Sequence, residues 1–468
     1  MIDLKALRED PDRYREGARK KRISVDIDRI LVLDERRRAI QHQQDEIRAE
    51  QRRLEKEAGP RIGGLMGKLK AAQGEEKARL ETEVAELRAK PAALKEKIQA
   101  LEAEGAEANA ALSEVLLTVP QPPDSEVPVG ASAEDNIEVR RWNPPHFDPA
   151  RSFSEQRGFE ARSHEELIKA LGIVDFERGV KVAGSRSYML VGDGMRLHNA
   201  VLRYAFDFIT EKHGFTPVSV PVVVREECMI GTGFFPAGKD QTYLVDEQSR
   251  GSAHDLYLTG TGEVGLMARH MEEILDESML PLKLATVSPC FRREAGAAGR
   301  DTAGLYRIHQ FDKVEQVVIC RADEAESKQW HKAMIGIVEE LLQSLELPYR
   351  LLQCCTGDLG PKNADMIDIE CWMPSRGALD GQGRASGEYG ETHSASRLYD
   401  FQCRRLNLRY KGESTGGKPV FCHSLNNTVA ASPRILIPIL EMYQRADGTV
   451  EVPRALRPYM GGREVIGG

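Results

Sequence analysis

The chain has 468 residues, a formal net charge of −8 and eight cysteines. This length exceeds what one compact core usually takes, so we expect two domains. The negative charge does not indicate a nucleic-acid binder by bulk electrostatics, although a local basic face can still bind one. The cysteines form no C-x-x-C pair and no Cys/His cluster with zinc spacing, which predicts reduced thiols, no zinc site and a cytoplasmic location.

A membrane location is not indicated either. No apolar run approaches the roughly 18 residues that a spanning helix needs. The first residues, M-I-D-L-K-A-L-R-E-D-P, mix acids and bases and lack an apolar core. We therefore expect neither a signal peptide nor a membrane partner.

A long charged stretch at about residues 28–117 carries a heptad pattern. Apolar residues recur every seven positions in its first part, at Leu33, Ile40, Ile47 and Leu54. In its second part the seam positions alternate in steps of four and three, at Leu80, Val84, Leu87, Pro91, Leu94, Ile98, Leu101, Gly105, Ala108, Leu112 and Val115. Such a seam is typical of a coiled coil. The short break between the parts predicts an antiparallel hairpin of two helices.

Glycines and prolines interrupt this pattern at defined places. Gly59, Gly63 and Gly64 mark the break, so we expect the first helix to end there. Pro91 and Gly105 fall on seam positions of the second helix, and both residue types weaken or kink a helix.

Four cations lie near the predicted tip of the hairpin with few acids beside them: Arg61, Lys68, Lys70 and Lys77. One interpretation is a solvated rod that serves oligomerisation. The other is a rigid arm whose cationic tip grips the phosphates of a folded RNA by shape rather than by base sequence. Prolines between about residues 118 and 145 then end the helix and favour an extended linker into a globular second region.

The stretch 289–318 organises the second region. Its two ends look like strands, joined by a Gly- and Ala-rich loop, which predicts a long hairpin. Arg292 and Glu294 alternate along the first strand, and Phe311 and Glu315 can share a face of the second. A guanidinium grips two anionic oxygens, an aromatic ring stacks on a base, and a carboxylate accepts bonds from an amine. Together these groups suit a nucleotide and a small amino acid bound side by side.

Two further segments offer polar groups for such ligands. Thr261 and Glu263 lie two apart, so that on one strand they would point the same way and could hold an ammonium group; an ordinary turn is the alternative. Glu391 and Ser394 offer hard oxygen ligands that suit Mg²⁺ bridging nucleotide phosphates. The alternative is that hydroxyls in this segment cap a helix beginning near Leu398.

A final polar strand, H-S-L-N-N-T-V-A-A-S-P-R, leads from His423 into an apolar helix. Arg434 stands at the start of that helix, where a cation is disfavoured by the positive end of the helix dipole. An anionic ligand at this place would resolve the conflict.

These motifs resemble those of class II aminoacyl-tRNA synthetases, in the form of bacterial-type seryl-tRNA synthetases. F-R-R-E…R-I-H-Q-F-D-K-V-E is similar to motif 2, the segment around Arg434 to motif 3, and the helix and strand before Pro221 to motif 1. The resemblance implies an α+β fold: a catalytic domain with an antiparallel sheet at 119–468, preceded by a tRNA-binding domain at 1–118 with a long coiled-coil arm at about 28–117. It also implies a homodimer with Pro221 at its interface.

The resemblance assigns a role to each candidate residue. The catalytic residues would be Arg292 and Arg434. Those near serine would be Thr261, Glu263, Arg292, Glu315, Asn426 and Thr428. Those near ATP would be Arg292, Glu294, Arg307, Phe311, Glu391, Ser394 and Arg434, with Mg²⁺ on Glu391 and Ser394. The arm with Arg61, Lys68, Lys70 and Lys77 would reach the long variable arm of the tRNA.

The implied activity is that of a serine–tRNA ligase, which forms seryl-adenylate from L-serine and ATP and then charges tRNA(Ser). Selenocysteine tRNA as a second acceptor is left open. Two alternatives to this function are a related ligase that charges a carrier protein and an inactive paralogue that acts as an RNA-binding module. A coiled-coil scaffold with an incidental globular domain is a third, but it leaves motifs 2 and 3 unexplained.

Overall fold

A computed structural model describes residues 1–245, 255–295, 304–379, 381, 385–467. The tip of the predicted motif 2 hairpin, including Arg300 and Asp301, lies outside these residues. The described chain divides into two compact units. The first, here called the arm, is Ser24–Val119, and the second, the body, combines Met1–Ile23 with Pro120–Gly468. The predicted functional boundary between residues 118 and 119 stays a prediction, because compactness alone does not define a tRNA-binding domain.

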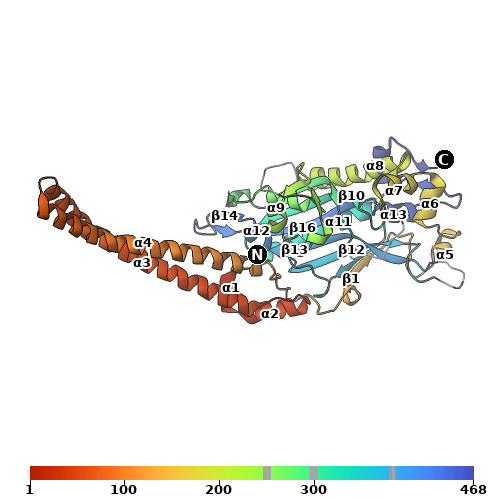
Figure 1. The fold of residues 1–468 in the computed structure, drawn as a ribbon. Helices are drawn as coiled ribbons and strands as arrows, with labels where there is room; N and C mark the ends of the chain where they lie inside the picture. Colours follow the sequence, from red (N-terminus) through yellow and green to blue (C-terminus); the bar gives the residue numbers. More distant parts are fainter. Residues whose placement is uncertain (246–254, 296–303, 380, 382–384, 468) are drawn as a thin grey trace. The chain divides into compact units, whose positions relative to one another are not determined.

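The arm consists of two long helices, α3 (Ile27–Leu69) and α4 (Gly74–Leu116), which lie side by side in Figure 1. The side chain of Asp26 accepts a bond from the backbone N–H of Arg29 and so caps α3. Val84, Ile98 and Leu112 of the predicted seam are buried between the helices, which confirms the helical hairpin.

The predicted end of the first helix is wrong. Gly59, Gly63 and Gly64 lie inside α3, as does Pro60, and the chain turns only between Leu69 and Gly74. Packing against α4 continues through this region, where Arg61 pairs with Glu83 at 3.7 Å. Tertiary contact along the seam therefore outweighs the weak local helix propensity of these residues.

One glycine of the seam is buried beside a polar side chain. Gly105 is buried in α4, and a side chain there would meet the Gln44 amide at 3.4 Å. Gln44 is also buried, and its Nε2 donates to the carbonyl oxygen of Leu101 at 2.8 Å. A side chain at Gly105 would therefore be in ordinary van der Waals contact with Gln44, whose buried amide has its hydrogen bond satisfied.

The body is built on an eight-stranded sheet in the order β1-β11-β12-β13-β16-β10-β9-β4. Neighbouring strands are antiparallel except β4 and β9, which are parallel, so the predicted α+β class with an antiparallel sheet is confirmed. The strands are β1 (Ile137–Trp142), β4 (Thr216–Pro217), β9 (Leu282–Phe291), β10 (Gln310–Cys320), β11 (Tyr349–Gln353), β12 (Asp365–Met373), β13 (Glu388–Tyr399) and β16 (His423–Ser432).

Two helices, α8 (Asp193–Asp207) and α11 (Glu324–Ser344), pack on this sheet (Figure 1). Leu425 and Val429 of β16 are fully buried in the resulting core, together with Met334 and Val338 of α11. The other described helices are α1 (Leu4–Glu9), α2 (Pro11–Lys20), α5 (Phe153–Arg157), α6 (His164–Leu171), α7 (Phe176–Ala183), α9 (Glu226–Gly231), α10 (Glu263–Ala268), α12 (Phe401–Arg405) and α13 (Leu436–Met442).

Short strands complete the body: β2 (Val174–Asp175), β3 (Met189–Leu190), β5 (Val223–Arg225), β6 (Tyr243–Val245), β7 (Leu256–Leu258), β8 (Ile274–Asp276), β14 (Arg409–Lys411), β15 (Val420–Phe421), β17 (Val450–Glu451) and β18 (Val465–Ile466). The helix considered near Leu398 is wrong, because β13 runs through to Tyr399 and α12 begins only at Phe401. Pairing of β13 with both β12 and β16 fixes this segment as a central strand.

Candidate active site

A cavity of about 250 Å³ opens over the centre of the sheet. The predicted site residues that line it are Thr261, Glu263, Arg292, Glu294, Arg307, Phe311, Glu391, Ser394, Asn426, Thr428 and Arg434. Glu315 does not line the cavity itself, but it lies directly behind Thr261, whose hydroxyl donates to it at 2.8 Å. The fold therefore brings together residues that are up to 173 positions apart in the sequence, counting from Thr261 to Arg434.

Two predicted local arrangements differ from the structure. Arg292 and Glu294 do not lie in a strand, because β9 ends at Phe291, and Glu294 has a positive φ of 50°. Thr261 and Glu263 do not share a strand either, because β7 ends at Leu258 and Glu263 opens α10. In both places the chain turns at the end of a strand, and the turn directs the side chains into the cavity.

Arg292 lies at the centre of the cavity wall. Its guanidinium carbon is 5.2 Å from the centre of the Phe311 ring, and its Nε donates to the Gly260 carbonyl at 3.3 Å. The Arg292 backbone N–H donates to the His309 carbonyl at 2.9 Å, and the His309 ring nitrogen Nδ1 lies 2.8 Å from the Arg292 carbonyl oxygen, so that Arg292 is held beside the return strand. The side chain thus presents a cation next to an aromatic face, an arrangement that suits an anionic group attached to a base.

Arg307 and Glu294 form the outer part of the same wall. The Arg307 guanidinium donates to the Glu294 carboxylate at 3.3 Å, and the Glu294 side chain is 13% exposed. This bond fixes the carboxylate at the rim of the cavity, where its remaining lone pairs can accept from an amine.

Two buried carboxylates stand at the other end, here called the amino-acid end. Glu315 is fully buried; it contacts Lys313 and accepts from the Asn426 amide at 3.2 Å. Lys313 also donates to the Thr261 hydroxyl at 2.9 Å. Because a buried carboxylate requires a partner, Lys313 stabilises Glu315 in this position.

Glu263 is held in the same way. Its two oxygens accept from the Lys362 ammonium at 2.6 and 2.7 Å, and the Gln402 amide donates to it at 2.7 Å. Lys362 also lies over the ring of Phe234, 4.1 Å from its centre. Each carboxylate at the amino-acid end thus has a lysine of its own.

Arg434 occupies the opposite, outer end. Its guanidinium donates to the backbone carbonyls of Tyr306 and Glu391 at 3.2 and 3.3 Å, and it pairs with the Glu391 carboxylate at 3.4 Å. The Tyr306 ring lies 4.5 Å from this guanidinium and 4.5 Å from that of Arg376. The expected position of a cation just before α13 is confirmed, and its protein partners come from the loop at Tyr306 and from the central strand β13.

The oxygen atoms beside Arg434 are of the kind that Mg²⁺ prefers as ligands. The carboxylate of Glu391 and the hydroxyl of Ser394 are hard oxygens, and both line the cavity beside Arg434. His393 between them is buried, which lowers the pKa of its imidazole to about 3, so it is neutral at pH 7 and adds no charge to this end.

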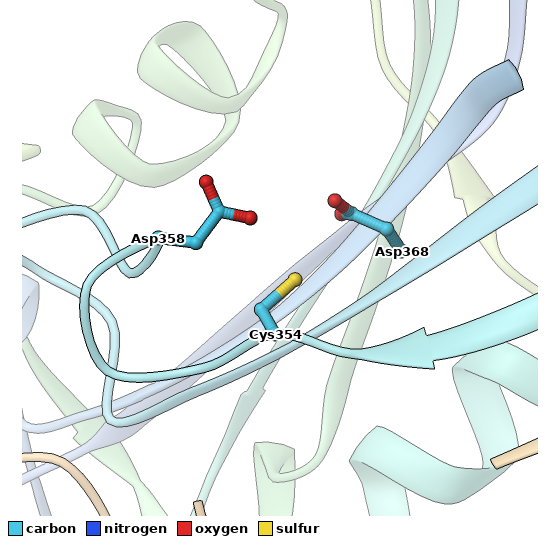
Figure 2. A group of neighbouring side chains, drawn as sticks. All are labelled: Cys354, Asp358 and Asp368. Carbon is cyan, nitrogen blue, oxygen red and sulfur yellow. The ribbon is translucent and has the colours of Figure 1, made fainter. Parts of the chain in front are cut away.

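Figure 2 shows another polar group, formed by Cys354, Asp358 and Asp368. Their ligand atoms lie within 4.8 Å of one another, and Asp368 pairs in register with Ser394. Burial raises the pKa of the Asp368 carboxyl well above its usual range, with Glu391 adding to the effect, and burial also raises the pKa of the Cys354 thiol. Metals bind the thiolate form of cysteine, so the raised pKa values favour protonated side chains over a bound metal in this group. The expectation of no zinc stays a prediction.

Several cavity residues were not anticipated. Lys313 lies between Phe311 and Glu315 on the same face of β10, so the strand alternation that suggested those two could have found it. Lys362, Phe234 and Tyr306 come from loops with no periodic pattern, and nothing in the sequence near them indicates the contact.

Comparison with known proteins is consistent with this geometry along the whole chain. The family model for the seryl-tRNA synthetase N-terminal domain matches residues 1–123, and that for the tRNA synthetase class II core domain (G, H, P, S and T) matches residues 243–443. The serine–tRNA ligase of Deinococcus radiodurans is 42% identical over 468 residues, covering 100% of this chain and 99% of its own. The chain belongs to the seryl-tRNA synthetase family.

Solved structures of the family have the same fold. The seryl-tRNA synthetase of Pyrococcus horikoshii complexed with ATP has a TM-score of 0.78 and 35% identity, covering 100% of this chain and 99% of its own. The cytoplasmic serine–tRNA ligase of Naegleria fowleri in complex with AMP has a TM-score of 0.76 and 33% identity, covering 97% and 95%. These relatives give no support to a carrier-protein ligase or an inactive paralogue. Within the described part of the chain, no helix combines the length and apolarity that crossing a bilayer requires.

Proposed function

We propose that this serine–tRNA ligase activates serine and charges tRNA(Ser) with the residues gathered in the cavity. In the first step a serine carboxylate oxygen would attack the α-phosphorus of ATP, forming seryl-adenylate as pyrophosphate leaves. In the second step a ribose hydroxyl of the terminal tRNA nucleotide would attack the carbonyl carbon, forming the ester as AMP leaves. The observation that carries the proposal is that the residues predicted from separate motifs line one cavity.

The middle of the cavity would hold the reacting groups. Arg292 would bridge the serine carboxylate and the α-phosphate, since a guanidinium can meet two anionic oxygens at once. Phe311 beside it would stack on the adenine, and Glu294 would accept from the adenine amine. Catalysis of this kind rests on positioning and on neutralising charge in the transition state.

The outer end would hold the remaining phosphates. Arg307 and Arg434 would contact them, and Glu391 and Ser394 would hold Mg²⁺. Bound there, the ion would neutralise phosphate charge and orient the leaving pyrophosphate. The carbonyl and carboxylate bonds of Arg434 keep its guanidinium at this end before ATP arrives.

The amino-acid end would select serine. Thr261, Glu263 and Glu315 would face the ammonium group, while Thr428 and Asn426 would lie beside the hydroxyl. A site built to hydrogen-bond a small hydroxyl rejects alanine, because its polar groups would be left unpaired.

The arm would bind the tRNA. Arg61, 66% exposed at its side chain, and Lys68 lie on the last turns of α3; Lys70 follows α3 directly, and Lys77 lies on the first turn of α4. Such a cationic tip fits phosphates along the long variable arm of tRNA(Ser).

A homodimer would cover an apolar surface of the body. Apolar side chains are unusually exposed between residues 180 and 195: Val180 (47%), Val182 (72%), Met189 (37%), Val191 (45%) and Met195 (44%). Pro221 is exposed as well. Exposed apolar side chains so close together in the chain favour a protein interface. The eight unpaired cysteines fit a reducing, cytoplasmic location.

Serine-dependent ATP–pyrophosphate exchange tests the activation step. The full chain should exchange with serine but not with alanine, and Arg292→Ala should lose the exchange by roughly a thousandfold. Arg293→Ala is the matched control, because the neighbouring Arg293 does not line the cavity, and it should retain exchange within about twofold. Absence of exchange with every amino acid contradicts the proposal; exchange without charging of tRNA(Ser) contradicts its second step.

A further inference from the structure

The carboxylates at the amino-acid end of the cavity each have a lysine partner before any substrate binds. Its two buried carboxylates, Glu263 and Glu315, are matched by two lysines, Lys362 and Lys313. Serine brings one ammonium group, one carboxylate and a neutral hydroxyl. No carboxylate is therefore left over for a second positive charge on the substrate.

Lys362 is held firmly in this position. The loop that carries it, residues 360–363, has its carbonyls occupied: Lys21 donates to Gly360 and Asn363 at 2.9 and 2.5 Å, and the Gln121 N–H donates to Pro361 at 2.8 Å. The Lys362 side chain itself is 13% exposed, and that of Glu263 is 2% exposed. The lysine is thus a fixed wall of the cavity rather than a mobile surface group.

We propose that Lys362 determines specificity by charge, excluding amino acids that carry a second ammonium group from the serine site. By neutralising Glu263 it removes the field that would otherwise attract such a group, and it adds like-charge repulsion. The sharpest competitor is 2,3-diaminopropionate, in which an amine replaces the serine hydroxyl at nearly the same size. The inference rests on the proposed function, because it assumes that serine binds at this end.

The wild-type enzyme tests the inference without any substitution. The charged groups facing this end are Glu263, Glu315, Lys313, Lys362 and Arg292. Exchange would be measured with 2,3-diaminopropionate and with serine across the pH range in which the side-chain amine of the analogue loses its proton. The ratio of kcat/KM, analogue to serine, should rise with pH, because the neutral amine escapes the repulsion. A ratio that falls with pH overturns the inference, since it would show that the site attracts the cation.

Substitutions at Lys362 test whether this residue causes the discrimination against 2,3-diaminopropionate. Lys362→Met should raise the analogue-to-serine ratio at least about tenfold, because a buried carboxylate is left unmatched. Lys362→Arg keeps the charge and should stay within about threefold of wild type. Adding Glu263→Gln to Lys362→Met should remove the gain, since neither charge remains. A merely structural role of Lys362 would change exchange with both amino acids alike.

Lys328→Met is the matched control outside the cavity. Lys328 pairs with Glu126 at 2.6 Å, a distance similar to that between Lys362 and Glu263, but its side chain is 41% exposed. This variant should leave the ratio unchanged within about twofold. An unchanged ratio in a folded Lys362→Met enzyme overturns the inference, and if that variant does not fold, the wild-type pH profile decides. Absence of wild-type exchange with serine would instead contradict the proposed function.

Discussion

The arm and the body of this protein are each stabilised internally, by different kinds of contact. In the arm, one seam between α3 and α4 buries residues such as Ile40 and Val84, both 5% exposed, and most other side chains face solvent. In the body, strands that are distant in the sequence pair with each other, and residues such as Leu425 and Val429 are fully buried. The comparison shows that a repeating local pattern suffices for a rod, whereas a binding cavity needs non-local strand pairing.

The largest expected effect on activity comes from substituting Glu315, a buried carboxylate of the body. Glu315→Gln keeps the shape of the side chain but leaves Lys313 without its ion partner and changes the bond from Thr261. We expect kcat/KM for serine in pyrophosphate exchange to fall roughly a thousandfold, because a buried network is broken at a ligand-binding point.

The control for this variant is Glu83→Gln in the arm, where Glu83 is 43% exposed at its side chain and pairs with Arg61 at 3.7 Å. It should leave exchange unchanged. A loss of exchange in the Glu83→Gln variant would show that the arm affects serine activation in the body.

The second-largest expected effect comes from changing the cationic residues near the tip of the arm. Changing Arg61, Lys68, Lys70 and Lys77 together to glutamine should raise KM for tRNA in aminoacylation by about 30-fold to 100-fold at low salt, because phosphate contacts dominate such binding. The salt dependence of charging should weaken at the same time. Serine-dependent exchange in the absence of tRNA should stay at the wild-type level; a parallel loss of exchange would mean that the tip affects the body.

Acidification should destabilise the body by protonating Asp365. Burial acts to raise the pKa of this carboxyl, but His331 and Arg397 outweigh it and lower the pKa to about 2. The folded pKa is below the unfolded value of about 3.9, so the stabilisation is present above that value and is lost as pH falls through 2. The free energy of unfolding should lose about 2 kcal/mol from this group between pH 5 and pH 2.

Asp365→Asn provides the comparison, because an amide does not titrate in this range. Urea unfolding at each pH gives the difference in free energy between wild type and variant, and this difference should shrink on acidification. A difference that stays constant would show that Asp365 titrates normally in the folded protein.

The smallest effect concerns an exposed ion pair between the two arm helices. Arg48 and Glu102 lie 2.8 Å apart, with side chains 39% and 50% exposed. Arg48→Ala should lower the free energy of unfolding of the arm by less than about 1 kcal/mol, because solvent screens exposed pairs. Helical circular dichroism during thermal unfolding would report the change. A loss as large as that expected at Asp365 would mean that specific ion pairs, and not only the seam, hold the arm.

Residue patterns gave different amounts of information about the two regions. For the arm, heptad spacing predicted both helices and their pairing, but three glycines suggested too early an end for α3. For the cavity, the motifs supplied the polar residues, and alternation correctly placed Phe311 and Glu315 on one side of β10. The turn after β9 was mistaken for a strand, because a turn at the end of a strand changes side-chain direction without changing the local residue pattern. After β7 the sequence left a strand and an ordinary turn open, and the structure has the turn.

The sequence by itself determined the helical arm, the class of the fold and the polar residues of the cavity, because periodicity and motif composition are local properties. Only the tertiary structure decided that α3 continues through Gly59 and Gly64 and that Gln44 is buried between the arm helices with a bond to Leu101. It alone paired Lys362 with Glu263, 99 positions away. Such contacts depend on chain segments that meet only after strand pairing and helix packing, and no local pattern records which buried charge will neutralise another.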